Sequence, residues 1–367
     1  MKQRITVLSL LAALAVVACV SGTALAQQDM PIHPMFERLR PNLHADTGNA
    51  PVTPLTTWNG SFVYSGHTYK YNMVGTAPST GTATTIKTFL IPIALKYVTS
   101  SGTTIFSPET IQSNGASAVT NTVNSPIFQP MTFTTPKGVN LGKTQYEDAF
   151  QRGNFWSTVG GTGYHVYLAK PVLGPLQTIT VPSTEGKIIT AFGVTVGTAD
   201  IDWFDAQLEA LMTKYSKYVT PNTFPIFITY NAYLTEFGGC CIGGYHSSYG
   251  SVSAPQAYAH FTYIGTPGAF SQDVSALSHE AGEWLDDPLV VNTSGNAVSC
   301  GILEVGDPEE GFTNYGGFPY TLNGFTYNLQ DLVYLEYFGA PKTTSVDGGT
   351  ESFHDNPFGL GICNNGG

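Results

Sequence analysis

The chain has 367 residues with 15 basic and 26 acidic side chains, so its formal net charge is −11. This acidic balance argues against nucleic acid and anionic membrane surfaces as partners. Only 11% of the residues are charged, while 40 are glycine and 20 are tyrosine, a composition typical of a β-rich exported protein with many turns.

Residues 1–26 indicate a signal peptide, with a basic start, an apolar run and a small-x-small cleavage site at Ala24-Leu25-Ala26. A second interpretation is open, because Val16-Val17-Ala18-Cys19 looks like a bacterial lipobox, and cleavage there would place a lipid anchor on Cys19. No other stretch has the ~18 apolar residues of a spanning helix. We therefore expect a secreted or periplasmic bacterial protein, free or lipidated, without a membrane-spanning segment.

Four more cysteines follow, Cys240, Cys241, Cys300 and Cys363. In an oxidising compartment, four cysteines indicate two disulfides. A bond between adjacent cysteines is strained, so we expect Cys240 and Cys241 each to reach Cys300 or Cys363. A zinc site made only of cysteines is the alternative, although the chain lacks a C-x-x-C pair.

The first predicted elements come from the N-terminal half. Residues 27–56 are rich in proline and predict an extended arm or linker. Residues 57–199 predict a β-rich N-terminal part, in which Pro92 indicates a bulge or an edge strand. Strands are predicted over 58–64, 85–98, 164–169, 178–182 and 188–196, and short helices over 107–123 and 144–155.

The C-terminal half, residues 200–367, predicts a core with a disulfide-tied C-terminal region. Its apolar spacing predicts a helix over 202–218, a strand over 225–233, a Gly- and Cys-rich loop over 238–246, a strand over 257–264, a helix over 272–286 and an amphipathic helix over 329–338. The expected fold class is therefore α+β, with a helix packed on a mixed sheet.

The helix over 272–286 carries the densest chemistry in the chain. His279 and Glu283 are four residues apart, so they project from one face and could bind one metal ion. Glu280 is offset by roughly 100°, where it could reach a water on that ion. Asp286 returns to the ligand face seven residues after His279. Downstream, Leu303-Glu304-Val305-Gly306-Asp307 supplies further carboxylates.

The H-E-x-x-E pattern, with an acidic turn about twenty residues later, resembles the active site of gluzincins, a zincin-fold family of metallopeptidases. The resemblance implies a zinc ion held by His279, Glu283 and Glu304, with Glu280 as the general base. It further implies that Asp307 orients the metal-binding histidine, although Asp307 could equally be the ligand itself. Asp286 is a second candidate to support the ligands, and His246 could stabilise an oxyanion.

One position departs from the gluzincin pattern. Glu283 stands where the second histidine of H-E-x-x-H usually lies. A second anionic ligand lowers the pKa of a metal-bound water less than a second histidine does, which weakens the expected peptidase chemistry. It also favours harder ions, so Mn²⁺ and Ca²⁺ are alternatives to zinc.

A second resemblance covers roughly residues 225–340. Ser278–Pro288, Leu303–Pro308, Tyr327–Asp331 and the segment Gly244-Tyr245-His246 are similar to segments of plant phosphate-induced EXORDIUM-type proteins and of similar bacterial secreted proteins. This resemblance implies a secreted or wall-associated protein with a metallopeptidase core.

Plainer interpretations of the same residues are open. His279 and Glu283 could form an ordinary ion pair on a charged helix face, and Glu304 could cap backbone amides of a loop. His246 and His260 could be structural histidines. Trp284, like most of the aromatic residues, is expected to pack the core.

Three hypotheses for function follow. The first is a secreted metal-dependent hydrolase, in particular a peptidase, acting on a peptide or a cell-surface polymer. The second is a non-catalytic surface protein with a structural metal ion. The third is a glycosidase with a carboxylate pair such as Glu280 and Glu304.

Overall fold

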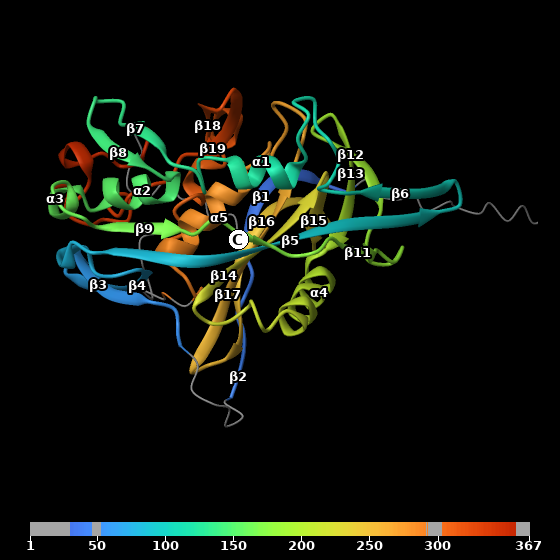
Figure 1. Ribbon diagram of the computed structural model, residues 1–367, viewed down its shortest axis with the longest axis horizontal. Helices are drawn as coiled ribbons and strands as arrows, with labels where there is room; N and C mark the ends of the chain where they lie inside the picture. Colours follow the sequence, from blue (N-terminus) through green and yellow to red (C-terminus); the bar gives the residue numbers. More distant parts are fainter. Residues whose placement is uncertain (1–29, 46–52, 291, 293–302, 357–367) are drawn as a thin grey trace, which may run out of the picture. The chain divides into compact units, whose positions relative to one another are not determined.

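The computed structural model describes residues 30–45, 53–290, 292 and 303–356. The elements in these ranges belong to one unit, Pro31–Gly367, and they are arranged around one large mixed sheet (Figure 1). The signal peptide expected over 1–26, Cys19, Cys300 and Cys363 lie outside the described residues.

The central sheet combines parallel and antiparallel strands. Strand β5 (Ala83–Thr99) is parallel to β14 (Thr223–Tyr230), which is parallel to β17 (Ala254–Tyr263). Strand β16 (Gly239–Ser251) then runs antiparallel to β17 and to β15 (Ala232–Glu236). The order is completed by β10 (Val172–Leu173) beyond β5, and by β13 (Val194–Asp200) and β12 (Ile188–Ala191) beyond β15.

Shorter strands extend this sheet and form three separate hairpins. Strands β1 (Ile32–Arg38) and β2 (Asn42–His44) pair with β16, so part of the predicted arm is hydrogen-bonded to the sheet. Strands β6 (Gly102–Phe106), β9 (His165–Leu168) and β11 (Gln177–Thr180) pair with β5. The hairpins are β3 (Thr57–Tyr64) with β4 (His67–Val74), β7 (Met131–Thr134) with β8 (Asn140–Thr144), and β18 (Gly317–Leu322) with β19 (Phe325–Gln330).

The described residues form five α-helices, which confirms the α+β fold class. They are α1 (Ala118–Asn124), α2 (Tyr146–Asn154), α3 (Trp156–Val159), α4 (Ile201–Lys214) and α5 (Ser275–Asp286). Short 3₁₀ turns lie at Pro78–Thr80, Asp307–Glu309, Thr313–Gly316 and Val346–Gly348. No helix among the described residues is long and apolar enough to cross a membrane.

Helices α4 and α5 lie against opposite faces of the sheet, and strand alternation decides which side chains meet each helix. On β16, the Tyr245 hydroxyl donates to Asp205 of α4, while the next residue, His246, contacts Glu280 of α5. On β14, Phe227 belongs to the core around α4, whereas the ring of Phe224 stacks on Trp284 of α5.

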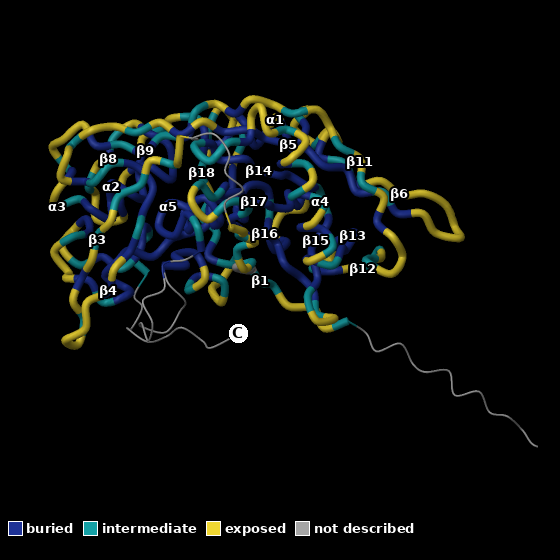
Figure 2. The backbone as a smooth tube through the Cα atoms, turned by 90° about the horizontal axis from the view of Figure 1, so that it is seen from below, coloured by how far each residue is buried: buried dark blue, intermediate teal, exposed yellow. Residues whose placement is uncertain are grey.

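Helix α5 lies inside the protein. All twelve of its residues are buried, and it contacts β16, β17, β19, β4 and α2. In Figure 2, α5 and the neighbouring central strands form the continuous dark blue region. The expected charged face of this helix therefore contacts other protein groups instead of solvent.

Two predicted elements in the C-terminal half are wrong. From Gly239 onward, the expected loop over 238–246 belongs to β16. Gly244 allows this strand to approach α5, because a Cβ at this position would lie 2.7 Å from Oε1 of Glu280. The expected helix over 329–338 is the end of β19 followed by turns. Its residues after Asp331 are almost all buried, so the segment has no polar face.

Two expectations in the N-terminal half also need correction. The helix predicted over 107–123 is confined to α1, which begins after Ser117, whose side chain accepts a hydrogen bond from the Thr120 amide. Pro92 lies on the interior strand β5, not on an edge strand. The pairing with β10 ends at Leu90 and that with β11 begins at Ile93, so the missing amide proton falls between two partner strands.

The cysteine expectation is wrong as well. Cys240 and Cys241 form a disulfide with each other. The prediction excluded a bond between adjacent cysteines because such a bond is strained, but the two Cα atoms are 3.0 Å apart and the peptide bond between them is cis. Neither sulfur is therefore free to pair with Cys300 or Cys363.

Candidate metal centre

Glu283 is at the centre of the candidate site, and its two carboxylate oxygens face two histidines. Its Oε1 lies 3.0 Å from Nε2 of His279, one turn earlier on α5. Its Oε2 lies 3.5 Å from Nδ1 of His246 on β16. The helical spacing brings the first pair together, whereas the second pair depends on the packing of α5 against the sheet.

Two groups of three residues have the geometry to hold a metal ion. His246, Glu283 and Glu304 form a buried group, and His279, Glu283 and Asp307 form a second group that shares Glu283. In each group, one potential ligand atom per residue lies within 4.8 Å of the others. Imidazole and carboxylate are suitable ligands for zinc and manganese.

The orientation of His279 is fixed by Gln330 at the end of β19. The Gln330 side-chain amide nitrogen donates to the Gly306 carbonyl, so its Oε1 accepts a hydrogen bond from Nδ1 of His279 at 2.9 Å. With the proton on Nδ1, Nε2 is the nitrogen that presents a lone pair to an ion. Nε2 is also the nitrogen that faces Glu283 and Asp307.

The turn around Gly306 brings the two downstream carboxylates to α5. The Gly306 amide donates to Oε1 of Glu283 at 3.1 Å. Glu304 before it is only 3% exposed, whereas the side chain of Asp307 after it is 43% exposed. The Glu304 end of the site is therefore buried, whereas the Asp307 end is exposed to solvent.

Glu280 lies beside these ligands but belongs to neither group. Its Oε2 is 3.3 Å from Nδ1 of His246, and its Oε1 has no hydrogen-bond partner among the described residues although the side chain is fully buried. Nε2 of His246 is likewise buried without a partner. Unpaired polar atoms in a protein interior are costly, and a bound ion with its water would satisfy them.

While no metal ion is bound, the negative charges of the neighbouring carboxylates stabilise the protonated forms of His246 and His279. Burial lowers the pKa of His246, but hydrogen bonds to Glu280 and Glu283 outweigh it and raise the pKa to about 10. Burial also opposes protonation of His279, yet attraction to Glu283 raises its pKa well above the usual value. A cation can take the place of these protons, because a metal ion competes with protons for the same lone pairs.

The buried carboxylates differ in pKa according to their neighbours. Burial raises the pKa of Glu283, but the two histidines lower it below its ordinary value. Burial and then the charge of Glu283 raise the pKa of Glu304 well above its ordinary value. A cation at Glu283 would offset the negative charge that raises the pKa of Glu304.

The structure places the other predicted site residues as follows. Asp286 is in neither metal group; Gln151 of α2 donates a hydrogen bond to it. His260 belongs to the opposite face of the sheet, where its Nε2 contacts Thr229 and its ring contacts Phe204. Burial lowers the pKa of His260 to about 3, so this histidine is neutral. From the sequence, Gln330 is notable only as one residue of the Tyr327–Asp331 segment, and no role at the site is predicted for it.

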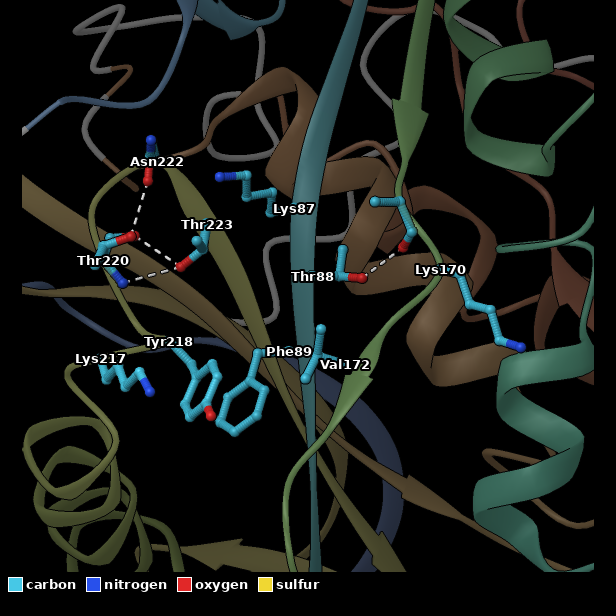
Figure 3. A pocket seen from close by; sticks show the side chains of 11 residues that line it. Lys87, Thr88, Phe89, Lys170, Val172, Lys217, Tyr218, Thr220, Asn222 and Thr223 are labelled. Atoms are coloured by element: carbon cyan, nitrogen blue, oxygen red, sulfur yellow. Dashed lines mark hydrogen bonds between the residues drawn. The ribbon is translucent and has the colours of Figure 1, made fainter.

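A separate cavity of about 260 Å³ opens beside β5 and contains none of the site residues (Figure 3). The stacked rings of Phe89 and Tyr218 form part of its wall, and Lys87, Lys170 and Lys217 line it. The residues that line this cavity include no carboxylate and no member of the two metal groups.

Comparisons with known proteins identify no relative: no protein-family model, curated protein or solved structure matches the chain. The buried group of His246, Glu283 and Glu304 therefore rests on the geometry of this chain alone.

Proposed function

We propose that the chain is a metal-dependent hydrolase, with the ion held at Glu283 and with Glu280 as the general base. The observation that carries this proposal is the position of Glu280. It is a buried carboxylate 3.3 Å from His246 and outside both ligand groups, and one of its oxygens has no hydrogen-bond partner within the described ranges.

When bound, the ion would lower the pKa of a coordinated water toward ~7. Glu280 would accept the proton of that water, because its carboxylate lies beside the ligands without being one. His246 would orient Glu280 through their contact, and Gly244 leaves the space into which the Glu280 carboxylate fits. Gln330 would hold the His279 ring in place.

The proposed substrate is a peptide or a cell-surface polymer outside the cytoplasm. This part of the proposal rests on the resemblance of His279-Glu280-x-x-Glu283 to gluzincin helices and on the signal peptide expected over 1–26. Substrate would approach at the Asp307 end, which is the exposed end of the site.

A structural metal ion is a second candidate, because the site is so deeply buried. His246 and Glu280 are fully buried, and Glu283 and Glu304 are only 2% and 3% exposed. Structural metal sites are closed, whereas catalytic sites keep an open position for water.

The substitution Glu280→Gln tests the hydrolase proposal. We expect the variant to retain its metal, measured by elemental analysis, and to hydrolyse a fluorogenic peptide library about 10²–10⁴-fold more slowly. Glu309→Gln is a matched control, because Glu309 is buried and binds Asn356 outside the site; it should retain both metal and hydrolysis.

Three outcomes separate the candidates. Unchanged hydrolysis in Glu280→Gln would show that Glu280 is not the base. Hydrolysis that survives removal of the metal by a chelator would refute the metal-dependent mechanism. A wild-type protein that binds metal but cleaves nothing in the library would favour the structural candidate.

A further inference from the structure

We propose that this site holds two metal ions and that Glu283 bridges them. The inference rests on the proposed metal site and adds the number of ions that this site holds. Glu283 is the only residue common to the two ligand groups, and each group has its own histidine and its own second carboxylate. A bridging carboxylate holds two ions about 3.5–4 Å apart in two-metal hydrolytic sites.

The two oxygens of Glu283 point to different partners, as a bridge requires. Oε1 is next to Nε2 of His279 at 3.0 Å, and that nitrogen is also 3.5 Å from Oδ1 of Asp307. Oε2 is instead next to His246 at 3.5 Å. The first ion would therefore lie among His279, Asp307 and Oε1, and the second among His246, Glu304 and Oε2.

The charge of the site also matches two divalent cations. Glu280, Glu283, Glu304 and Asp307 carry four negative charges when ionised. Histidine ligands are neutral when they bind a metal. Two divalent ions balance the charge of four carboxylates. One ion would leave two negative charges uncompensated in a site where three of the four carboxylate side chains are buried.

The two positions would differ in access to solvent. The group of His246 and Glu304 is enclosed. Beside it, Nε2 of His246 and Oε1 of Glu280 are buried atoms that have no hydrogen-bond partner in the part of the chain that the structure describes. The group of His279 includes Asp307, whose side chain is 43% exposed. The ion at Asp307 should therefore exchange faster than the ion at Glu304.

Metal counting tests the proposal. The full chain is dialysed to equilibrium against Zn²⁺, Mn²⁺ or Ca²⁺, and bound ions are counted by elemental analysis. We expect two ions per chain for at least one of the three metals. Asp307→Asn and Glu304→Gln should each reduce the count to about one, and Glu283→Gln should reduce it below one. Glu309→Gln, with its buried carboxylate outside the site, should leave the count at two.

The outcomes are distinguishable. One ion per chain with all three metals would overturn the two-metal inference while leaving the proposed hydrolase site in place. No bound ion would overturn both. Two ions that survive in both Asp307→Asn and Glu304→Gln would place the second ion elsewhere and also overturn the inference. Circular dichroism of each variant shows whether a lowered count reflects loss of ligands or loss of the fold.

Discussion

At the scale of single residues, Gly306 controls how closely the downstream turn approaches α5. Its φ of −91° is accessible to any residue, so its backbone does not require glycine. The limited space does require glycine, because a Cβ at this position would lie 2.3 Å from Nδ1 of His279 and 2.6 Å from two carbons of the same ring. Gly306 also binds Glu283 through its amide and Gln330 through its carbonyl.

We expect Gly306→Ala to bind metal about 10–100-fold more weakly than the wild type, the range found when groups that orient ligands are lost. The added methyl must displace the His279 ring or the turn, and either movement changes the contact between His279 and Glu283. The dissociation constant for Zn²⁺, measured by competition with a chelating dye, checks this expectation.

Gly311→Ala is the matched control, because no atom lies within 4 Å of a Cβ at Gly311. It should bind Zn²⁺ as the wild type does. Equal affinity in Gly306→Ala would mean that the ring of His279 is free to shift without loss of the site.

Spacing in the sequence shows which site residues are neighbours on one helix, but it does not show how distant residues are placed beside them by the fold. His279 and Glu283 could be predicted because their spacing is one helical turn. His246 was assigned to a loop, and its place beside Glu283 follows from the pairing and alternation of β16. Gln330 is 51 residues from its partner His279, and local periodicity contains no signal for such a contact.

At the scale of elements, α5 depends on one aromatic contact with the sheet. The ring of Trp284 stacks on Phe224 of β14 at 3.8 Å between centroids and 9° between planes, and Trp284 is fully buried. Its indole Nε1 has no hydrogen-bond partner within the residues that the structure describes. The contact is therefore one of apolar area and ring stacking, and it fixes α5 against the same sheet that carries His246.

We expect Trp284→Ala to lower the free energy of unfolding by about 3–5 kcal/mol, the range for removing a large aromatic side chain from a core. Trp284→Phe should cost much less, because it keeps a ring against Phe224 and removes an unpaired N–H group. Urea denaturation of the metal-free protein, followed by circular dichroism, measures both values.

Phe237→Ala provides the comparison at the surface. Phe237 is 97% exposed, so its removal should change the free energy of unfolding by less than about 0.5 kcal/mol. If Trp284→Ala were as mild as this control, α5 would be held by its other contacts and the stack would be dispensable.

The predicted elements were right where hydrophobic periodicity was clear and wrong where burial erased it. Helix α4 has one buried and one exposed face, and the three- and four-residue spacing of its apolar residues predicted it. The segment after Asp331 has buried residues on every side, so periodicity could not distinguish a helix from irregular core structure. In the same way, Gly244 of β16 contributed to the prediction of a loop, although it marks close contact with α5.

At the scale of the whole molecule, an acidic chain buries several carboxyl groups, and the stability of the fold should depend on pH. Asp205 of α4 is a case outside the metal site. Its Oδ1 accepts hydrogen bonds from Tyr258 and Tyr245, which lie on the sheet face that α4 covers. Burial raises the pKa of Asp205 to about 6; these two bonds oppose the rise, while the charges of Glu209 and Asp202 add to it.

This raised pKa predicts that the contribution of Asp205 to stability falls as pH rises. In the unfolded chain the carboxyl ionises near pH ~3.9, whereas in the folded protein it keeps its proton up to about pH 6. Between these values the folded state binds more protons, so the free energy of unfolding decreases with increasing pH. A shift of about two pKa units corresponds to at most about 3 kcal/mol.

Asp205→Asn removes this titration while keeping an acceptor for the two tyrosine hydroxyls. Relative to the wild type, we expect the variant to gain up to about 3 kcal/mol of stability between pH 4 and pH 6, and to stay constant above pH 7. Urea denaturation at four pH values measures this difference, in which the titration of groups common to both proteins cancels.

Asp202→Asn on the same helix is the control; Asp202 is exposed in the first turn, where a negative charge stabilises the helix by about 0.3–1 kcal/mol. Its loss should therefore lower stability slightly at neutral pH, and a gain in stability as large as that of Asp205→Asn would contradict the role of burial at Asp205.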